Sequence, residues 1–191
     1  MATPHRKTCK RYNIPGHAHA LTFSCFRRQM FLSKNGSRQW LIEAIDRSRD
    51  KLRFHVWAYV IMPEHAHVLI WPTESHYDIS AILNSIKQSV SKRALIHVRR
   101  HAPEFLRRME DRQPNGDVHY RFWQRGGGYD RNVHEPATAF KQIEYMHNNP
   151  VRRGLCMKPE DWIWSGAADY AGIRIGPLRL DRESLPMNLS S

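Results

Sequence analysis

Two strand-forming segments separated by only two residues constrain the fold of this chain more than any other feature. Residues 54–62 and 65–71 are rich in Val, Ile, Trp and Tyr, and only Pro63 and Glu64 lie between them. A connection this short joins antiparallel neighbours in a sheet. The pattern therefore predicts a β-hairpin around which the remaining elements are arranged.

Segments on either side of the hairpin complete a split βαβ pattern. Alternating apolar residues predict a strand over 20–26, and apolar residues at helical spacing predict helices over 33–50 and 78–100. The fourth strand is expected over 118–124, whereas 102–116 lacks periodicity and is expected to be a charged connection. This order predicts an α+β, ferredoxin-like antiparallel sheet (βαββαβ) with helices on one face.

A further helix and a tail follow the predicted sheet. The helix is expected over 135–149, with Pro150 ending it. Residues 12–155 are then expected to form one domain, with 156–175 packing back on it and 176–191 lacking order. The full architecture is therefore a ferredoxin-like domain with an additional C-terminal helix, which bears a tyrosine, and a tail.

The charge balance favours a polyanionic partner. The chain has 30 Lys and Arg against 18 Asp and Glu, a formal net charge of +12. Such an excess favours nucleic acid, with an anionic membrane surface as the alternative. No apolar run approaches the roughly 18 residues of a spanning helix, so we expect a cytosolic protein with no membrane partner. The three cysteines lack CxxC spacing and indicate neither a disulfide framework nor a zinc finger.

His65 and His67 are candidate metal ligands. Residues two apart in a strand project from the same side, so both imidazoles can face one cation. Because the chain has 12 histidines, two partly buried strand histidines are an alternative of equal weight. A second pair, His17 and His19, precedes the first strand, and the antiparallel sheet is expected to separate the two pairs.

Tyr145 is a candidate nucleophile because it points away from the apolar side of its helix. At about 100° per residue, Ile143 and His147 share one side and Tyr145 faces almost directly away. Lys141, Tyr145 and Asn149 form a polar line at i, i+4 and i+8. A nucleophile, a cation and an amide thus lie in one row. From these residues alone, an ordinary polar helix face is the favoured alternative.

Basic and aromatic side chains provide candidate DNA contacts. Cationic side chains can pair with phosphates, and aromatic rings can stack on unpaired bases. The phosphate candidates are Lys87, Lys92, Arg93, Arg99, Arg100, Arg107, Arg108 and Lys141, and the stacking candidates are Trp123 and Tyr129. Any one of them is more often a solvated or core residue, so only their abundance is informative.

Several motifs resemble those of known transposases. Residues 62–70, Met-Pro-Glu-His-Ala-His-Val-Leu-Ile, resemble the histidine-hydrophobic-histidine (HUH) signature of single-tyrosine transposases. Residues 144–155 and 161–165 resemble the tyrosine helix and tail of REP-associated tyrosine transposases, and parts of 122–130 resemble the stretch before that helix. The resemblance covers roughly residues 12–170.

The resemblance implies an enzyme that cleaves and rejoins single-stranded DNA through a 5′-phosphotyrosine. His65 and His67 match the metal-binding histidines, Asn149 matches a third, amide ligand, and Tyr145 matches the nucleophile. The implied cofactor is Mg²⁺ or Mn²⁺ acting as a Lewis acid. No nucleotide cofactor is expected, because the phosphotyrosyl bond conserves the energy of the broken phosphodiester. Ala66 is smaller than the hydrophobe usual between the histidines.

The implied partner is single-stranded or hairpin DNA, including REP-like palindromes, bound by a monomer or a homodimer. The implied location is the bacterial cytoplasm, in association with the nucleoid. A competing interpretation is a non-catalytic ferredoxin-like module that binds single-stranded DNA or RNA, which leaves the histidine pair and Tyr145 unexplained. A histidine phosphodiesterase that uses both HxH pairs is a weaker alternative, because the sheet separates them.

Overall fold

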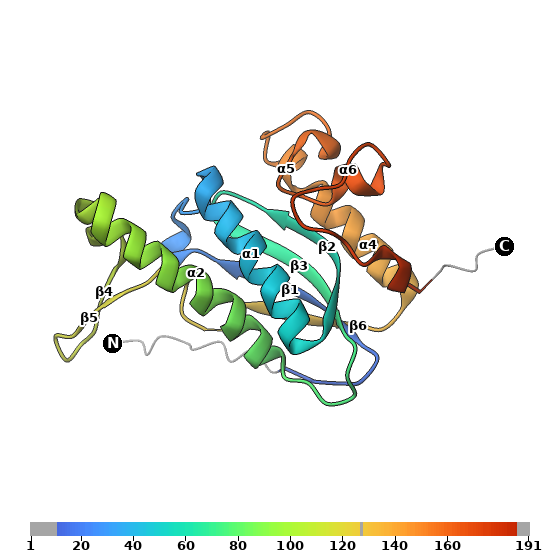
Figure 1. The fold of residues 1–191 in the computed structure, drawn as a ribbon, viewed down its shortest axis with the longest axis horizontal. Helices are drawn as coiled ribbons and strands as arrows, with labels where there is room; N and C mark the ends of the chain where they lie inside the picture. Colours follow the sequence, from blue (N-terminus) through green and yellow to red (C-terminus); the bar gives the residue numbers. More distant parts are fainter. Residues whose placement is uncertain (1–10, 127, 187–191) are drawn as a thin grey trace, which may run out of the picture.

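A four-stranded antiparallel sheet forms the centre of the protein (Figure 1). The structure, a computed structural model, describes residues 11–126 and 128–186. The strands are β1 (Ala18–Ser24), β2 (Phe54–Ile61), β3 (His65–Pro72) and β6 (Tyr129–Val133), in the spatial order β2-β3-β1-β6. This order is the one that the βαββαβ pattern predicts, so the α+β class is confirmed.

The hairpin of β2 and β3 fixes which residues face each side of the sheet. The strands pair antiparallel from Ile61↔Ala66 outward, with a register shift between Val56 and Ala58. Because of this bulge, Trp57 and Ala58 both belong to the same apolar cluster, instead of alternating. The predicted hairpin is therefore confirmed.

Helices α1 (Asn35–Leu52) and α2 (Ile79–His101) cover one face of the sheet (Figure 1). The apolar sides of both helices join β1, β2 and β3 in the larger core cluster, as Leu41, Ile45 and Ile82 illustrate. The Asp78 side chain caps α2 by accepting a hydrogen bond from the Ser80 amide at 2.7 Å. Both helices were predicted from their periodicity, to within two residues at each end. In the part of the chain described, no helix has the length and apolar character to cross a membrane.

Helix α4 (Pro136–His147) packs on the opposite face of the sheet, mainly against β2. Its buried residues Ala139, Ile143 and Met146 join Ala18 and Ala20 of β1 in the second core cluster. The expectation that the helices of the βαββαβ pattern lie on one face is confirmed for α1 and α2, and the additional helix α4 covers the other face. The helix does not run on to Asn149 as predicted, because a second short helix, α5 (Asn149–Arg152), begins there and includes Pro150 in its first turn.

The C-terminal segment lies along the outer edge of β2. It contains η3 (Pro159–Asp161), α6 (Ala167–Tyr170) and η4 (Arg182–Ser184). The Ile61 amide donates to the Trp164 carbonyl at 2.9 Å, and the Val56 amide donates to the Asp181 carboxylate at 2.8 Å. The expected lack of order over 176–191 is wrong for 176–186, where Leu178 and Leu180 are buried. Residues 187–191 lie outside the described residues.

The predicted fourth strand over 118–124 is wrong. Within that range β5 (Val118–Tyr120) pairs only with β4 (Glu110–Arg112), in a separate two-stranded ribbon. The connection 102–116 is also more regular than expected, because it contains η2 (Pro103–Phe105), α3 (Leu106–Met109) and β4. The fourth position is taken by β6, whose sequence YDRNV is mostly polar and gives a weak strand signal.

Candidate active site

The imidazoles of His65 and His67 converge on the face of the sheet that α4 covers. Their Nε2 atoms are 3.0 Å apart, and their rings are nearly perpendicular. The opposite nitrogen of each ring is also held: Nδ1 of His65 lies 3.2 Å from Glu64 Oε1, and Nδ1 of His67 lies 2.7 Å from Thr22 Oγ1. Thr22 stands directly opposite His67 in the pairing of β1 with β3. The predicted convergence of the two side chains is thus confirmed.

Burial keeps both imidazoles neutral at physiological pH. It lowers the pKa of His67 to about 4, and the repulsion that two protonated imidazoles would experience adds to the effect. The pKa of His65 is also lowered by burial, although the Glu64 carboxylate opposes this. For Glu64, burial acts to raise the pKa, but His65 and Arg153 reverse the direction and the carboxyl pKa lies below its usual range. Neutral imidazole is the form that binds metal ions.

The donor set fits a divalent cation. For a metal–ligand bond of about 2.1 Å, two ligands at a right angle are about 3.0 Å apart, which equals the observed Nε2–Nε2 separation. Partners on the far nitrogens are the usual arrangement for metal-binding histidines. Among the described residues, no group of three His, Cys, Asp or Glu side chains is placed to hold a metal. A third ligand must therefore come from an amide, a water molecule or a substrate oxygen.

Tyr145 lies beside this histidine pair. Its ring centroid is 6.3 Å from that of His67, and the rings are nearly perpendicular. Tyr145 is 46% exposed, whereas Ile143 and His147 on the other side of α4 are buried, as the helical spacing predicts. The guanidinium of Arg152 lies over the tyrosine ring, 5.4 Å from its centroid. The hydroxyl side of the site is therefore accessible to a large substrate.

Asn149 is hydrogen-bonded to the backbone beside Tyr145, whereas Lys141 is exposed to solvent. The Asn149 amide nitrogen donates to the Tyr145 carbonyl at 3.1 Å, so the side chain is held one turn from the tyrosine. Its role as a third ligand stays a prediction. Lys141 is exposed on α4.

The second histidine pair is separate from the first, as expected. His19 pairs with Ile70, at the opposite end of β3 from His65. It is fully buried, and its ring nitrogens contact Asp130 and the Tyr77 hydroxyl, each at 2.8 Å. This arrangement excludes a shared site for the two HxH pairs.

Trp123 and Lys87, two of the expected DNA contacts, both make hydrogen bonds within the protein. Trp123 is 5% exposed, and its indole N–H donates to the Lys87 carbonyl at 3.0 Å, so it cannot stack on a base without leaving the core. The ammonium of Lys87 donates to the Gly126 carbonyl at 3.0 Å. Burial and the charge of Arg11 lower the pKa of Lys87 to about 8. The interpretation of Trp123 as a surface contact is wrong, whereas a phosphate contact for the partly exposed Lys87 stays a prediction.

The other basic candidates are exposed, but most of them are far from the histidine pair in the fold. Lys92, Arg93, Arg99 and Arg100 belong to α2, which packs on the opposite face of the sheet from α4. Arg93 is already paired with Glu43. Tyr129, the second stacking candidate, is 56% exposed at the start of β6.

Several residues at the site had no assigned role in the sequence. Thr22 and Arg153 come from β1 and from the segment after α5, so only the fold brings them to the histidines. Arg28 lies close enough for its charge to lower the pKa of His65. It has a positive φ of 53°, and it follows Arg27, with a φ of 52°. Two successive residues other than glycine with positive φ are strained, and such strain is common at functional sites. The strain is seen in the backbone dihedral angles and not in the sequence.

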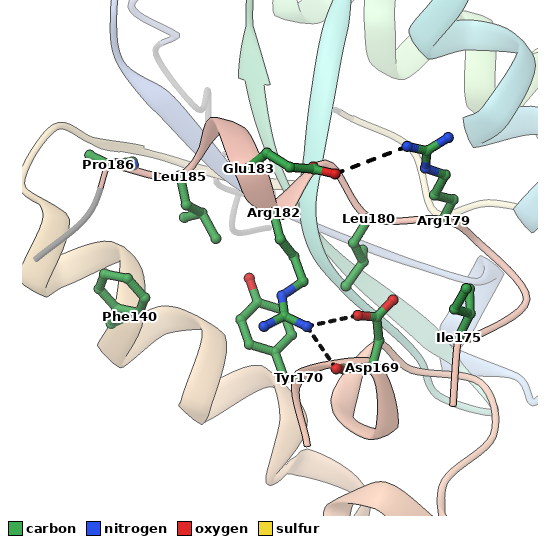
Figure 2. Close-up of a pocket in the computed structure, with 10 residues that line it drawn as sticks. All are labelled: Phe140, Asp169, Tyr170, Ile175, Arg179, Leu180, Arg182, Glu183, Leu185 and Pro186. Atoms are coloured by element: carbon green, nitrogen blue, oxygen red, sulfur yellow. Dashed lines mark hydrogen bonds and ion pairs between the residues drawn. The ribbon is translucent and has the colours of Figure 1, made fainter. Parts of the chain in front are cut away.

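A separate groove of about 940 Å³ lies between α4, α6 and the C-terminal segment. Figure 2 shows Arg182 extending over the Tyr170 ring and pairing with Asp169. The groove is lined by Phe140, Asp169, Tyr170, Ile175, Arg179, Leu180, Arg182, Glu183, Leu185 and Pro186. None of the candidate catalytic or metal-binding residues is among them.

Comparison with solved structures shows that the fold occurs in another protein. A comparison with solved structures matches a REP-associated tyrosine transposase bound to a REP hairpin, with a TM-score of 0.64 and 22% identity, over 95% of this chain and 98% of the other. It also matches a protein from Deinococcus radiodurans R1, provisionally classed as a transposase, with a TM-score of 0.44 and 17% identity, over 77% of this chain and 97% of the other. No curated protein matches.

The family comparison covers the part of the chain that carries the histidine pair. Residues 14–126 match the model of IS200-like transposases. This range includes His65 and His67 and ends before Tyr145. The match extends over more than half of the chain, and the chain therefore belongs to the IS200-like transposase family.

Proposed function

We propose that this protein cleaves and rejoins single-stranded DNA through a covalent bond to Tyr145, with a divalent metal ion held at His65 and His67. The observation that carries the proposal is the position of Tyr145, which is exposed beside His67 on the same face of the sheet. An enzyme that transfers a phosphodiester to itself needs a nucleophile next to a group that stabilises charge on the phosphate.

In the proposed cleavage step, the phenol oxygen of Tyr145 forms a bond to phosphorus and the bond from phosphorus to the 3′ oxygen breaks. The phenol proton passes to solvent, and the leaving 3′ oxygen takes up a proton to become a hydroxyl. The products are a 5′-phosphotyrosine and a free 3′ end. Attack by a 3′ hydroxyl on the phosphotyrosine reverses these changes and joins a strand, so no nucleotide cofactor is required.

The residues around Tyr145 orient it for this step. Arg152 lies over the ring and restricts its rotation, while its charge favours an approaching phosphate. Asn149, bonded to the backbone of Tyr145, is the proposed third ligand. Mg²⁺ or Mn²⁺, when bound to His65, His67 and Asn149, supplies Lewis-acid polarisation of the phosphate. Because these residues lie in one chain, the tyrosine acts with its own histidines, and a monomer suffices.

Hairpin DNA is the proposed substrate. The solved structure with a similar fold is bound to a REP hairpin, and the net charge of +12 suits a polyanion. Exposed cations on α2 and α4, including Lys92, Arg100 and Lys141, are the proposed phosphate contacts. Tyr129 is the proposed platform for an unpaired base.

The proposal is tested by incubating the protein with labelled hairpin DNA that carries single-stranded flanks, in the presence of Mn²⁺. A band of DNA linked to protein is expected on a denaturing gel for the wild type. Tyr145→Phe, His65→Ala and removal of the metal should each abolish it. Tyr12→Phe is the matched control, because Tyr12 is 57% exposed and lies outside the site. If all variants bind the hairpin equally and none forms the band, a non-catalytic binding module replaces this proposal.

A further inference from the structure

Glu64 connects the turn of the histidine hairpin to the segment that follows the tyrosine. Its side chain is almost buried, with 8% of the residue exposed. One carboxylate oxygen, Oε1, lies 3.2 Å from Nδ1 of His65 and accepts a hydrogen bond from Arg153 at 2.8 Å. The carbonyl of Glu64 accepts from the Cys25 amide at 2.8 Å, so the turn is also fixed to the end of β1. A nearly buried carboxylate is therefore held in one position.

The ion-pair contact between Glu64 and His65 favours one tautomer of the imidazole ring. At 3.2 Å from the Glu64 carboxylate, Nδ1 of His65 is favoured to carry the proton, because a lone pair on that nitrogen would face a negative charge. In the neutral ring, Nε2 then keeps its lone pair, and this atom faces His67. The Thr22 hydroxyl next to His67 can either donate or accept, so it leaves the tautomer of His67 free to change. Glu64 therefore sets the tautomer of His65.

Arg153 connects the segment that carries Tyr145 to the carboxylate oxygen Oε1 of Glu64. It lies 89 positions from Glu64 in the sequence, immediately after α5. The Arg153 amide donates to the Asn149 carbonyl at 3.1 Å, and Asn149 is bonded to the backbone of Tyr145. A continuous series of contacts thus runs from His65 through Glu64 and Arg153 to the tyrosine.

We propose that Glu64 is a positioning residue that orients His65 for the metal, and that Arg153 uses the same carboxylate to hold the tyrosine segment in register with it. This inference rests on the proposed function and adds two residues that align the histidine pair with the tyrosine segment. Carboxylates behind metal-binding histidines raise ligand basicity and fix ring orientation. Glu64 lies behind His65 in this way. Because Arg153 donates to the same carboxylate, the orientation of Glu64 also depends on where the tyrosine helix lies.

The first arm of the test measures metal binding without DNA. Mn²⁺ titrations followed by electron paramagnetic resonance would compare the wild type with Glu64→Ala and Glu64→Gln. The alanine variant should bind Mn²⁺ about 10- to 100-fold more weakly, and glutamine, which keeps an acceptor oxygen, should recover part of the loss. Glu74→Gln is the matched control, because Glu74 forms an exposed ion pair with Arg53.

A spectroscopic readout separates positioning from a general structural role. ¹⁵N NMR of the imidazoles should show His65 with its proton on Nδ1 in the wild type and a mixture of tautomers in Glu64→Ala. If Glu64→Ala lowers only the melting temperature, while the tautomer and the Mn²⁺ affinity stay unchanged, the positioning role is wrong.

The second arm measures the connection to the tyrosine. Arg153 is 56% exposed, so Arg153→Ala should fold. It should keep its Mn²⁺ affinity within about threefold, because Glu64 still holds His65. Its kcat for DNA cleavage should fall about tenfold or more at an unchanged KM, because the nucleophile is no longer aligned. Arg53→Ala should match the wild type. An unchanged kcat for Arg153→Ala would overturn the role of Arg153.

The outcomes also distinguish this inference from the proposed function. If Glu64→Ala weakens Mn²⁺ binding but the wild type forms no covalent DNA product, the positioning of His65 stands and the proposed function fails. If the product forms and depends on His65 and Tyr145, but neither Glu64 nor Arg153 affects metal binding or kcat, the function stands and this inference fails.

Discussion

Protonation of His147 should loosen the helix that carries Tyr145. His147 lies on the buried side of α4, is 6% exposed, and contacts the Tyr170 ring at 5.2 Å. Its Nε2 is buried and has no hydrogen-bond partner among the residues described. Burial therefore lowers the pKa of His147 from 6.5 to about 4. The native state favours the neutral imidazole and resists its protonation.

The sign and size of the effect follow from this shift. Between the folded pKa of about 4 and the unfolded value of 6.5, the unfolded chain binds more protons, so stability is complete above the window and falls as the pH drops through it. At 1.36 kcal/mol per pKa unit the full loss is about 3 kcal/mol, of which about 2 kcal/mol appears between pH 7 and pH 5.

Urea denaturation at both pH values, for wild type and His147→Leu, measures this contribution. The loss of unfolding free energy between pH 7 and pH 5 should be about 2 kcal/mol smaller in His147→Leu, since leucine has no proton to gain. His119→Leu is the control, because His119 is exposed on β5 and His147 is retained. Equal pH dependence in His147→Leu and wild type would refute the assignment of this contribution to His147.

Three other changes test how the fold supports the site. Asp181→Ala should lower the unfolding free energy in urea by about 1–3 kcal/mol, because it leaves the buried Val56 amide without its acceptor; an unchanged midpoint would contradict this. Gly128→Ala should release β6 from β1 and speed hydrogen exchange of the β6 amides, since a Cβ there would lie 2.1 Å from the Thr22 carbonyl oxygen. Gly116→Ala, with a similar positive φ but no atom within 4 Å, should leave β6 protected. Trp123→Ala should cost about 3–5 kcal/mol of stability, whereas a loss of DNA affinity at full stability would restore its interpretation as a base-stacking residue.

The sequence predicted those elements whose residues repeat with a clear period. Helices α1 and α2 each bury one regular side, and β2 and β3 are nearly continuous runs of strand-forming residues buried on both faces, so their patterns follow directly from the geometry of helices and strands. The β6 strand, Tyr129–Val133, has one buried residue. Its place in the sheet depends on pairing with β1 and on the approach of Gly128 to Thr22, which are long-range contacts.

In the candidate site, too, the sequence predicts local features but not long-range contacts. The i, i+2 spacing of His65 and His67 and the outward direction of Tyr145 are local properties, and both are visible in the sequence. The contact between Glu64 and Arg153 spans 89 positions and exists only once α4 packs on the sheet. Trp123 was misinterpreted because its own segment does not show whether its ring is buried, which depends on contacts with residues distant in the sequence, such as Phe23 and Lys87.

Mass spectrometry of the covalent product would identify the nucleophile. After reaction with hairpin DNA and Mn²⁺, nuclease and trypsin treatment would leave a nucleotide on the peptide that was attacked. Residues 142–152, which follow Lys141 and end at Arg152, form a tryptic peptide with Tyr145 as its single tyrosine. The added nucleotide mass is expected on this peptide, with fragmentation placing it on Tyr145. A covalent product attached to any other peptide would contradict this expectation.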